Sequence, residues 1–376
     1  SSQFGSSARA LSIIFFCWPS IAAPTEDKES TMGFQEYLSG ARGCLVFVSV
    51  LAVVTGLVFE ILNKKLMDMV RSKPWCAQAM NLQKALAMNF GYKEEECTFE
   101  AMLDGYSFVI IFCGHHFVAG CCMLPVVLMG WEACGTTGQL LFVVAALSDV
   151  ALDMFDCFKN FCRTFLYSYI PWSSPCPLAC FIVLCCLHHP LAMSMVIPMV
   201  LHYPTMRSFH LIAVSLLFAA GICFLSGAYK FTLDVKSKGG FMQYKVVVIL
   251  QLVTIWFTRG YVWFTQVYVT LTTFRSHGDT KFFIAGSVAA VLMSLFNIVM
   301  IMDATDAAKK WLPRPVPTED AEHEELKAQI VRSHSSVLSV PSIMTDILSP
   351  EAKQFRASVQ VLVAANKFKK GISKKD

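Results

Sequence analysis

The stretch that decides the fold lies at residues 43–62 and reads GCLVFVSVLAVVTGLVFEIL. It contains a single charged residue, Glu60. A helix of about 20 residues is enough to cross the hydrocarbon core of a bilayer. Including this stretch, apolar runs of spanning length lie at residues 43–62, 106–131, 139–158, within 176–203, at 208–230, within 244–274 and at 282–302. The sequence therefore predicts an all-α fold, a multi-pass membrane helix bundle of about seven transmembrane helices.

The composition of the whole chain agrees with this fold class. Hydrophobic residues make up 55% of the 376 residues and charged residues 15%, against about 25% charged in soluble domains. The mean hydropathy is +0.53, which excludes a soluble protein of this length. The net charge is only +4, and we expect no nucleic-acid partner. The expected partners are membrane lipids, and a homo-oligomer is compatible with the sequence.

The hydropathy pattern divides the chain into five segments. They are an N-terminal extension at 1–42, a first transmembrane helix with a polar cytosolic loop at 43–104, a membrane domain at 105–275, a last transmembrane helix at 276–303, and a tail at 304–376. The extension is either signal-like, because residues 11–23 are apolar and end in Ala22-Ala23, or an artefact that precedes a true start at Met32. Within residues 176–203, Pro177, Pro190 and Pro198 predict a kinked or broken helix.

Lysine and arginine residues favour one side of the predicted membrane. With the segment before residue 43 outside, the inner side receives most of them, and the C-terminal tail is cytosolic. In that tail Phe355, Val359 and Leu362 recur at helical spacing ahead of a lysine-rich end. This pattern predicts either a basic amphipathic helix on the anionic cytosolic leaflet or a solvated helix with a disordered end.

Ionisable residues inside the predicted spans are the candidate functional residues. Each costs about 3 kcal/mol or more in hydrocarbon, so it normally faces the bundle interior. They are His115 and His116, Asp149, Asp153 and Asp156, His188 and His189, and Arg259. The three aspartates share one helix face through their spacing of four and three residues. We expect the histidines to face Asp149 and Asp153 with Arg259 offsetting their charge, and Asp156, near the span end, to be interfacial.

A metal centre is not expected from these histidines. Membrane di-iron enzymes need histidines in HxxHH and HxxxH clusters, which bring ring nitrogens from neighbouring turns to two irons. The chain has nine histidines, and its two His-His pairs lack a third histidine at those offsets. We therefore predict no metal site and no bound cofactor.

Five short motifs follow one another in the membrane domain. They read GHH at 114–116, SDVALDMF at 148–155, LHHP at 187–190, LLFAAGICFL at 216–225 and WFTR at 256–259. Their order resembles the TLC domain, the lipid-linked module of translocation-associated membrane proteins, ceramide synthases and TLC-domain-containing proteins. The resemblance covers about residues 105–275. It implies a role in membrane lipid homeostasis, sphingolipids included, and a location in the endoplasmic reticulum. Ceramide synthases carry further histidine and acidic residues after their His pair, and residues 216–224 have none.

Three functional hypotheses follow. The first is a lipid-binding or regulatory membrane protein of the TLC type, with His115, His116 and Arg259 in a structural or substrate-binding polar core. The second is a ceramide-synthase-like N-acyltransferase with acyl-CoA as co-substrate. There His188 or His189 would act as general base on a long-chain amine, oriented by Asp149 or Asp153. The third is a proton-coupled transporter, against which stands the lack of an internal repeat.

Overall fold

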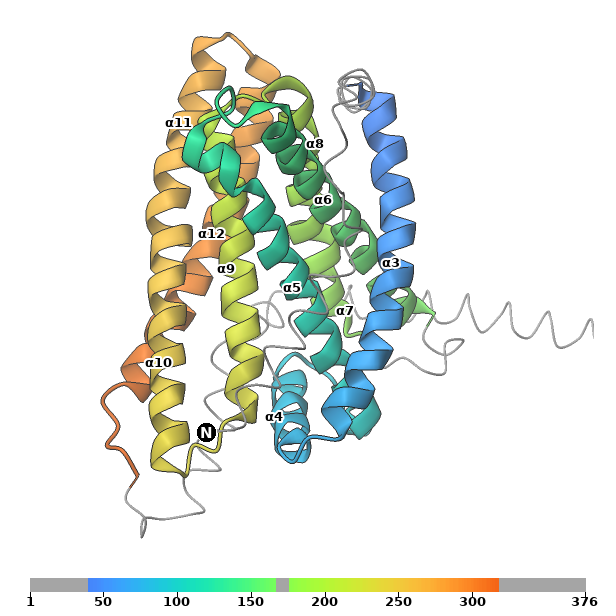
Figure 1. Cartoon of the computed structure of the whole chain (residues 1–376), viewed down its shortest axis with the longest axis vertical. Helices are drawn as coiled ribbons and strands as arrows, with labels where there is room; N and C mark the ends of the chain where they lie inside the picture. Colours follow the sequence, from blue (N-terminus) through green and yellow to red (C-terminus); the bar gives the residue numbers. More distant parts are fainter. Residues whose placement is uncertain (1–39, 167–175, 318–376) are drawn as a thin grey trace, which may run out of the picture.

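The computed structural model describes residues 40–166 and 176–317, and every regular element in these two ranges is helical (Figure 1). The elements are α3 (Ala41–Arg71), α4 (Cys76–Asn89), η1 (Glu94–Glu96), α5 (Phe99–Met129), α6 (Gly135–Phe165), α7 (Leu178–Phe181), η3 (Ile182–His188), α8 (His189–His202), α9 (Arg207–Thr232), α10 (Lys238–Ile255), η4 (Trp256–Val262), α11 (Trp263–Ser276) and α12 (Thr280–Trp311). The expectations for residues 1–39 and for the amphipathic tail helix lie outside the described residues.

Six helices are long and apolar enough to cross a membrane, and the predicted all-α, multi-pass bundle is confirmed. They are α3, α5, the continuous run from α7 to α8, α9, the run from α10 to α11, and α12. Each coincides with an expected span. The remaining expected span, at 139–158, lies in α6, which is 31 residues long but is not among the six. This helix packs against α3, α5 and α8 and carries the three aspartates.

The outer faces of the six helices are those of a protein in lipid. On α3, which lies at the edge of the bundle (Figure 1), Val50, Val53 and Leu57 are 59%, 64% and 63% exposed. These side chains gain nothing from water and are stable only against hydrocarbon. The chain is therefore an integral, multi-pass membrane protein.

Two of the runs contain π-helical segments. The expected break within residues 176–203 is the π-helical segment η3, which lies between α7 and α8. Pro190 follows it in the first turn of α8. The second segment, η4, interrupts the run from α10 to α11 without a proline. A π-helical turn closes its hydrogen bonds five residues apart, widens the helix, and is frequent at functional sites.

Two apolar clusters close the bundle at its ends. At one end Trp311 of α12 packs against Tyr244 of α10, with ring centroids 4.6 Å apart. At the other end Phe142 of α6 packs against His210 and Phe209 of α9 at 4.7 Å and 5.6 Å. The described chain enters at the second end with α3 and leaves at the first end with α12. The interior between the two clusters is where the polar residues lie.

Close backbone approach holds α5 against α9 between these clusters. A Cβ atom added at Gly221 would lie 2.7 Å from the Cβ of Phe117 and 2.9 Å from its backbone nitrogen. Such proximity is possible only because glycine lacks a side chain. In a membrane this packing matters because lipid is as apolar as the helices, so association depends on van der Waals fit.

We predict that Gly221→Ala destabilises the bundle by about 1–3 kcal/mol, because α5 and α9 must separate to admit the methyl group. Thermal unfolding of the purified protein in detergent measures this. The control is Gly114→Ala on α5, where an added Cβ meets nothing within 4 Å. Equal melting temperatures for the two variants would contradict the packing argument.

Candidate functional site

A cavity of about 630 Å³ lies inside the bundle. Its walls come from α4, α5, α6, α7, η3, α8, α9, α10, η4, α11 and α12, and most of the lining side chains are apolar. Six expected site residues line it: His116, Asp149, Asp153, His188, His189 and Arg259. His115 is the expected site residue that is not part of the lining.

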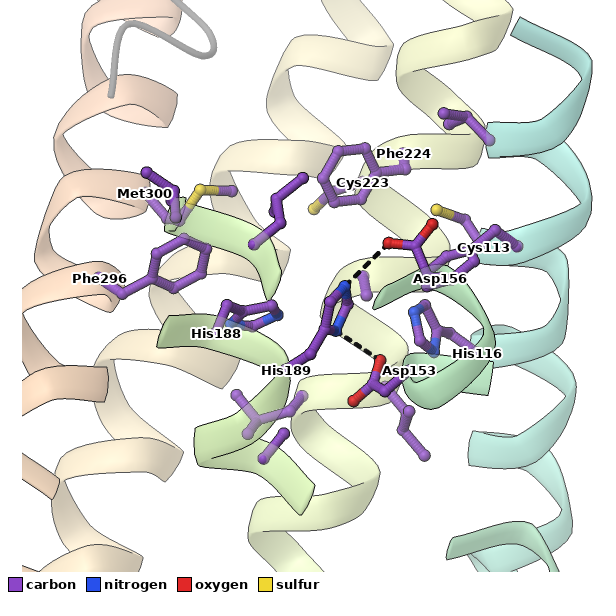
Figure 2. Close-up of a pocket in the computed structure, with 18 of the residues that line it drawn as sticks. Cys113, His116, Asp153, Asp156, His188, His189, Cys223, Phe224, Phe296 and Met300 are labelled. Atoms are coloured by element: carbon purple, nitrogen blue, oxygen red, sulfur yellow. Dashed lines mark hydrogen bonds and ion pairs between the residues drawn. The ribbon is translucent and has the colours of Figure 1, made fainter. Parts of the chain in front are cut away.

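His189 lies at the centre of the polar lining, between two aspartates of α6 (Figure 2). Its Nδ1 forms an ion pair with Asp153 Oδ1 at 2.7 Å, and its Nε2 forms a hydrogen bond with Asp156 Oδ2 at 3.0 Å. All three side chains are buried, with 4%, 4% and 8% of the residue surface exposed for His189, Asp153 and Asp156. The spacing of three residues on α6 places both carboxylates on the face that α8 covers. Asp156 is thus a direct partner of His189, contrary to the expectation that it is interfacial, because α6 extends nine residues beyond it.

His116 forms the second histidine–aspartate pair of the cavity. Its Nδ1 lies 2.6 Å from Asp149 Oδ1, one turn along α6 from Asp153. The ring of Phe112 packs edge-on against the imidazole, with centroids 4.7 Å apart. Among the described residues no group forms a hydrogen bond with His116 Nε2. This nitrogen is therefore available to a molecule in the cavity.

His188 and His115 have no carboxylate partner among the described residues. His188 stacks on Phe296 of α12 at 4.9 Å, and Figure 2 shows it between that ring and His189. His115 packs edge-on against Phe59 of α3 at 5.8 Å. In both rings Nδ1 is buried without a hydrogen-bond partner in the described chain. Of each His-His pair, the second histidine meets α6 and the first faces elsewhere, because neighbouring helical residues point about 100° apart.

Arg259 does not offset the aspartates by direct contact. It leaves η4 toward α12, where its Nη1 donates a hydrogen bond to Asn297 Oδ1 at 2.8 Å. Its guanidinium carbon lies 5.5 Å from the centre of the Phe296 ring. The expected interior location holds, but the partner is a neutral amide. Asn297 lies in the last apolar run of the sequence. A polar side chain within a predicted span is the sequence feature that indicates such a buried partner.

Lys230 is a further buried cation in the lining that the motif analysis did not single out. Only 3% of its surface is exposed, and its Nζ donates to Gln251 Oε1 at 2.7 Å. Gln251 in turn donates to the carbonyl oxygen of Cys223 at 2.7 Å. Asp303 of α12 also lines the cavity. The sequence does not predict the burial of Lys230, because this residue ends an apolar run, where a lysine side chain usually reaches the membrane surface.

One group of possible metal ligands is present in the described ranges. His115, His116 and Asp149 each offer a ligand atom within 4.8 Å of the other two. Asp149 already forms a hydrogen bond with His116, and His115 is not part of the cavity lining. The geometry therefore favours a hydrogen-bonded pair here.

The two pairs differ in what they can do chemically. Both ring nitrogens of His189 are engaged by carboxylates, so this residue holds α6 and α8 together and has no lone pair to offer a substrate. His116 has one nitrogen on Asp149 and one free, which is the arrangement a general base requires. Among the described histidines of the cavity lining, His116 is the one that combines a nitrogen held by a carboxylate with a free nitrogen.

Comparison of the chain with protein-family models, with curated proteins and with solved structures found no match. The resemblance to the TLC domain therefore stays a prediction from the motifs.

We predict that Asp156 and His189 stabilise the fold as a unit. In a double-mutant cycle of Asp156→Ala and His189→Ala, we expect a coupling energy of about 0.5–3 kcal/mol, because either single change already removes their hydrogen bond. Unfolding in mixed micelles measures it. His189→Ala combined with Thr272→Val, an exposed position on α11, is expected to be additive. An additive Asp156–His189 cycle would show that the two residues do not interact.

Proposed function

We propose that this protein binds a membrane lipid in its interior cavity and thereby influences membrane lipid composition, sphingolipids included. The observation that carries the proposal is the cavity itself: about 630 Å³, largely apolar, with ionisable groups in its middle. Ligand sites typically occupy about 300–1,000 Å³ and combine an apolar lining with a few polar groups. A lipid presents the matching combination of hydrocarbon chain and polar head. The TLC-like motifs at 105–275 support the same class of ligand.

A binding role is favoured over catalysis by two features. The His pair at 188–189, where the resemblance would place a general base, is occupied at His189 by two carboxylates and lacks a carboxylate at His188. Residues 216–224 supply no histidine or acidic residue to the cavity. A lipid can therefore be held and oriented by these groups without being transformed.

We predict that filling the cavity displaces the bound lipid. Ala192 of α8 lines it, and Ala192→Phe adds a ring where a lipid chain would lie. Native mass spectrometry of the purified protein is expected to find lipid on the wild type and little on this variant. Ala285→Phe, on the exposed face of α12, is the matched control and retains lipid. Wild-type protein that carries no lipid when purified from membranes would defeat the proposal.

An N-acyltransferase of the ceramide-synthase kind is the second candidate, and the free Nε2 of His116 is the observation that favours it. In this reaction the nitrogen of a long-chain amine attacks the carbonyl carbon of an acyl-CoA thioester. His116 would take the amine proton at Nε2 and return it to the leaving thiolate, so that an amide and free coenzyme A form. Asp149 would hold the imidazole through Nδ1.

This candidate predicts that His116→Gln lowers N-acylation of a long-chain base in membranes by roughly 10²- to 10⁴-fold while folded protein still accumulates. His202→Gln, at an exposed position at the end of α8, serves as the control and keeps full activity. If the wild type acylates no long-chain base, the acyltransferase hypothesis is wrong, and the lipid-binding proposal is unaffected.

We further propose that the C-terminal tail is cytosolic, that its basic segment meets the anionic leaflet, and that the protein resides in the endoplasmic reticulum. The described chain enters and leaves at opposite ends of the bundle (Figure 1). The exit end carries more basic residues, and the positive-inside rule assigns it to the cytosol. The basic residues at the exit end include Arg71, Lys73, Lys84, Lys93, Lys236, Lys238, Lys309, Lys310 and Arg314. Those at the entry end include Arg42, Arg207, Arg275 and Lys281.

A tag fused after Asp376 is accordingly expected to be digested by protease in sealed microsomes. A tag fused before residue 40 is expected to be protected until detergent is added. Protection of the C-terminal tag would overturn the orientation.

A further inference from the structure

Arg259 is a buried cation without a counter-ion in the described chain. It is 5% exposed and lines the cavity. No carboxylate of the described residues lies within 4.0 Å of its guanidinium nitrogens. Its partners are the neutral amide of Asn297 and the ring of Phe296. A charge in this position is costly unless an anion approaches it.

Unused hydrogen-bond donors accompany this charge. The Nε of Arg259 and the Nδ2 of Asn297 are both buried and have no partner among the described residues. Asn297 is fully buried, at 0% exposure, and it is held by Arg259 Nη1 through its oxygen. Its NH₂ group is therefore left to donate. Arg259 lines the cavity, whereas Asn297 lies behind the lining. The guanidinium is therefore the group that matches the oxygens of a carboxylate or a phosphate.

The three aspartates of α6 do not satisfy Arg259, because they are already engaged. Asp149 bonds to His116, and Asp153 and Asp156 hold His189. The other buried cation of the lining, Lys230, donates a hydrogen bond to Gln251, and the carboxylate of Asp303 lines the same cavity. Arg259 therefore has no ion-pair partner among the described residues, and a ligand can supply its counter-charge.

An apolar stripe leads away from Arg259 along the same helix. Trp263, Val267, Leu271 and Phe274 follow it at intervals of four, four, four and three residues, and all four line the cavity. With a rise of 1.5 Å per residue, the stripe extends about 22 Å. The hydrocarbon of one leaflet is about 15 Å thick, half of the usual core. A long acyl chain therefore fits along this face.

We propose that Arg259, held in position by Asn297, binds the anionic head group, a carboxylate or a phosphate, of a single-chain amphiphile whose hydrocarbon lies along the α11 stripe. This inference rests on the proposed lipid-binding function and names the ligand class. The histidine–aspartate pairs then form the opposite wall, on the α6 side of the cavity.

The test uses full-length protein in nanodiscs of zwitterionic lipid and four probes. Oleate carries a carboxylate, oleoyl lysophosphatidic acid carries a phosphate, methyl oleate is neutral, and sphingosine is cationic. We expect wild-type protein to bind oleate or the phosphate at least about tenfold more tightly than methyl oleate, a difference of about 1.4 kcal/mol. The stronger of the two anions identifies the natural head group.

Two variants separate binding from folding. Arg259→Gln is expected to lose the preference for the anion. Asn297→Asp places a carboxylate beside the guanidinium, so we expect a melting temperature no lower than wild type together with loss of the anion preference. Arg275→Gln, at the exposed end of α11 and outside the lining, is the control and keeps the preference.

The outcomes distinguish this inference from the function on which it rests. If the wild type binds methyl oleate or sphingosine as tightly as the anions, the anion site is wrong and lipid binding stands. If an Asn297→Asp protein of wild-type stability still prefers the anion, the assignment to Arg259 and Asn297 is also wrong. If none of the four probes binds, both proposals fail together.

Discussion

The architecture depends on three carboxylates that α6 carries into the interior of a membrane bundle. A carboxylate in hydrocarbon is tolerated only when it is paired and turned away from lipid. Asp149, Asp153 and Asp156 share one face of α6, so the partners must come from the helices that cover that face. His116 on α5 and His189 on α8 supply them, at 2.6 Å, 2.7 Å and 3.0 Å. The order in which α5, α6 and α8 pack is therefore an electrostatic requirement as much as a matter of shape.

The two π-helical segments serve the same interior. His188 ends η3 and Arg259 lies within η4, so each of the two interrupted runs changes its geometry where it places an ionisable residue at the cavity. A π-helical stretch has more residues per turn and shifts the faces that follow it. Within η4, Phe257 and Tyr261 face the exterior, while Arg259 between them faces inward.

Much of this could be predicted from the sequence, because each inference depended on a property of one helix. Apolar runs located the spans, and spacing placed the aspartates on one face. Partner assignment was a different problem. Whether His189 meets Asp149 or Asp156 depends on how far α8 is shifted along α6 and how each helix is rotated, and neither is encoded in a local pattern. For this reason the sequence predicts an interfacial Asp156 and not a partner of His189. It also does not connect Asn297, a neutral residue in an apolar run, with Arg259.

The distribution of charge in the cavity follows from these pairings and bears on what can enter it. On the α6 wall every aspartate has a histidine partner, Asp149 in His116 and both Asp153 and Asp156 in His189. On the α12 side Arg259 meets an amide and a ring. If Arg259 paired with an aspartate, its charge would be neutralised within the protein and would not favour an anion in the cavity. Because the histidines occupy the aspartates, the arginine is left for a ligand, and the helix pairing that permits the fold also creates the binding site.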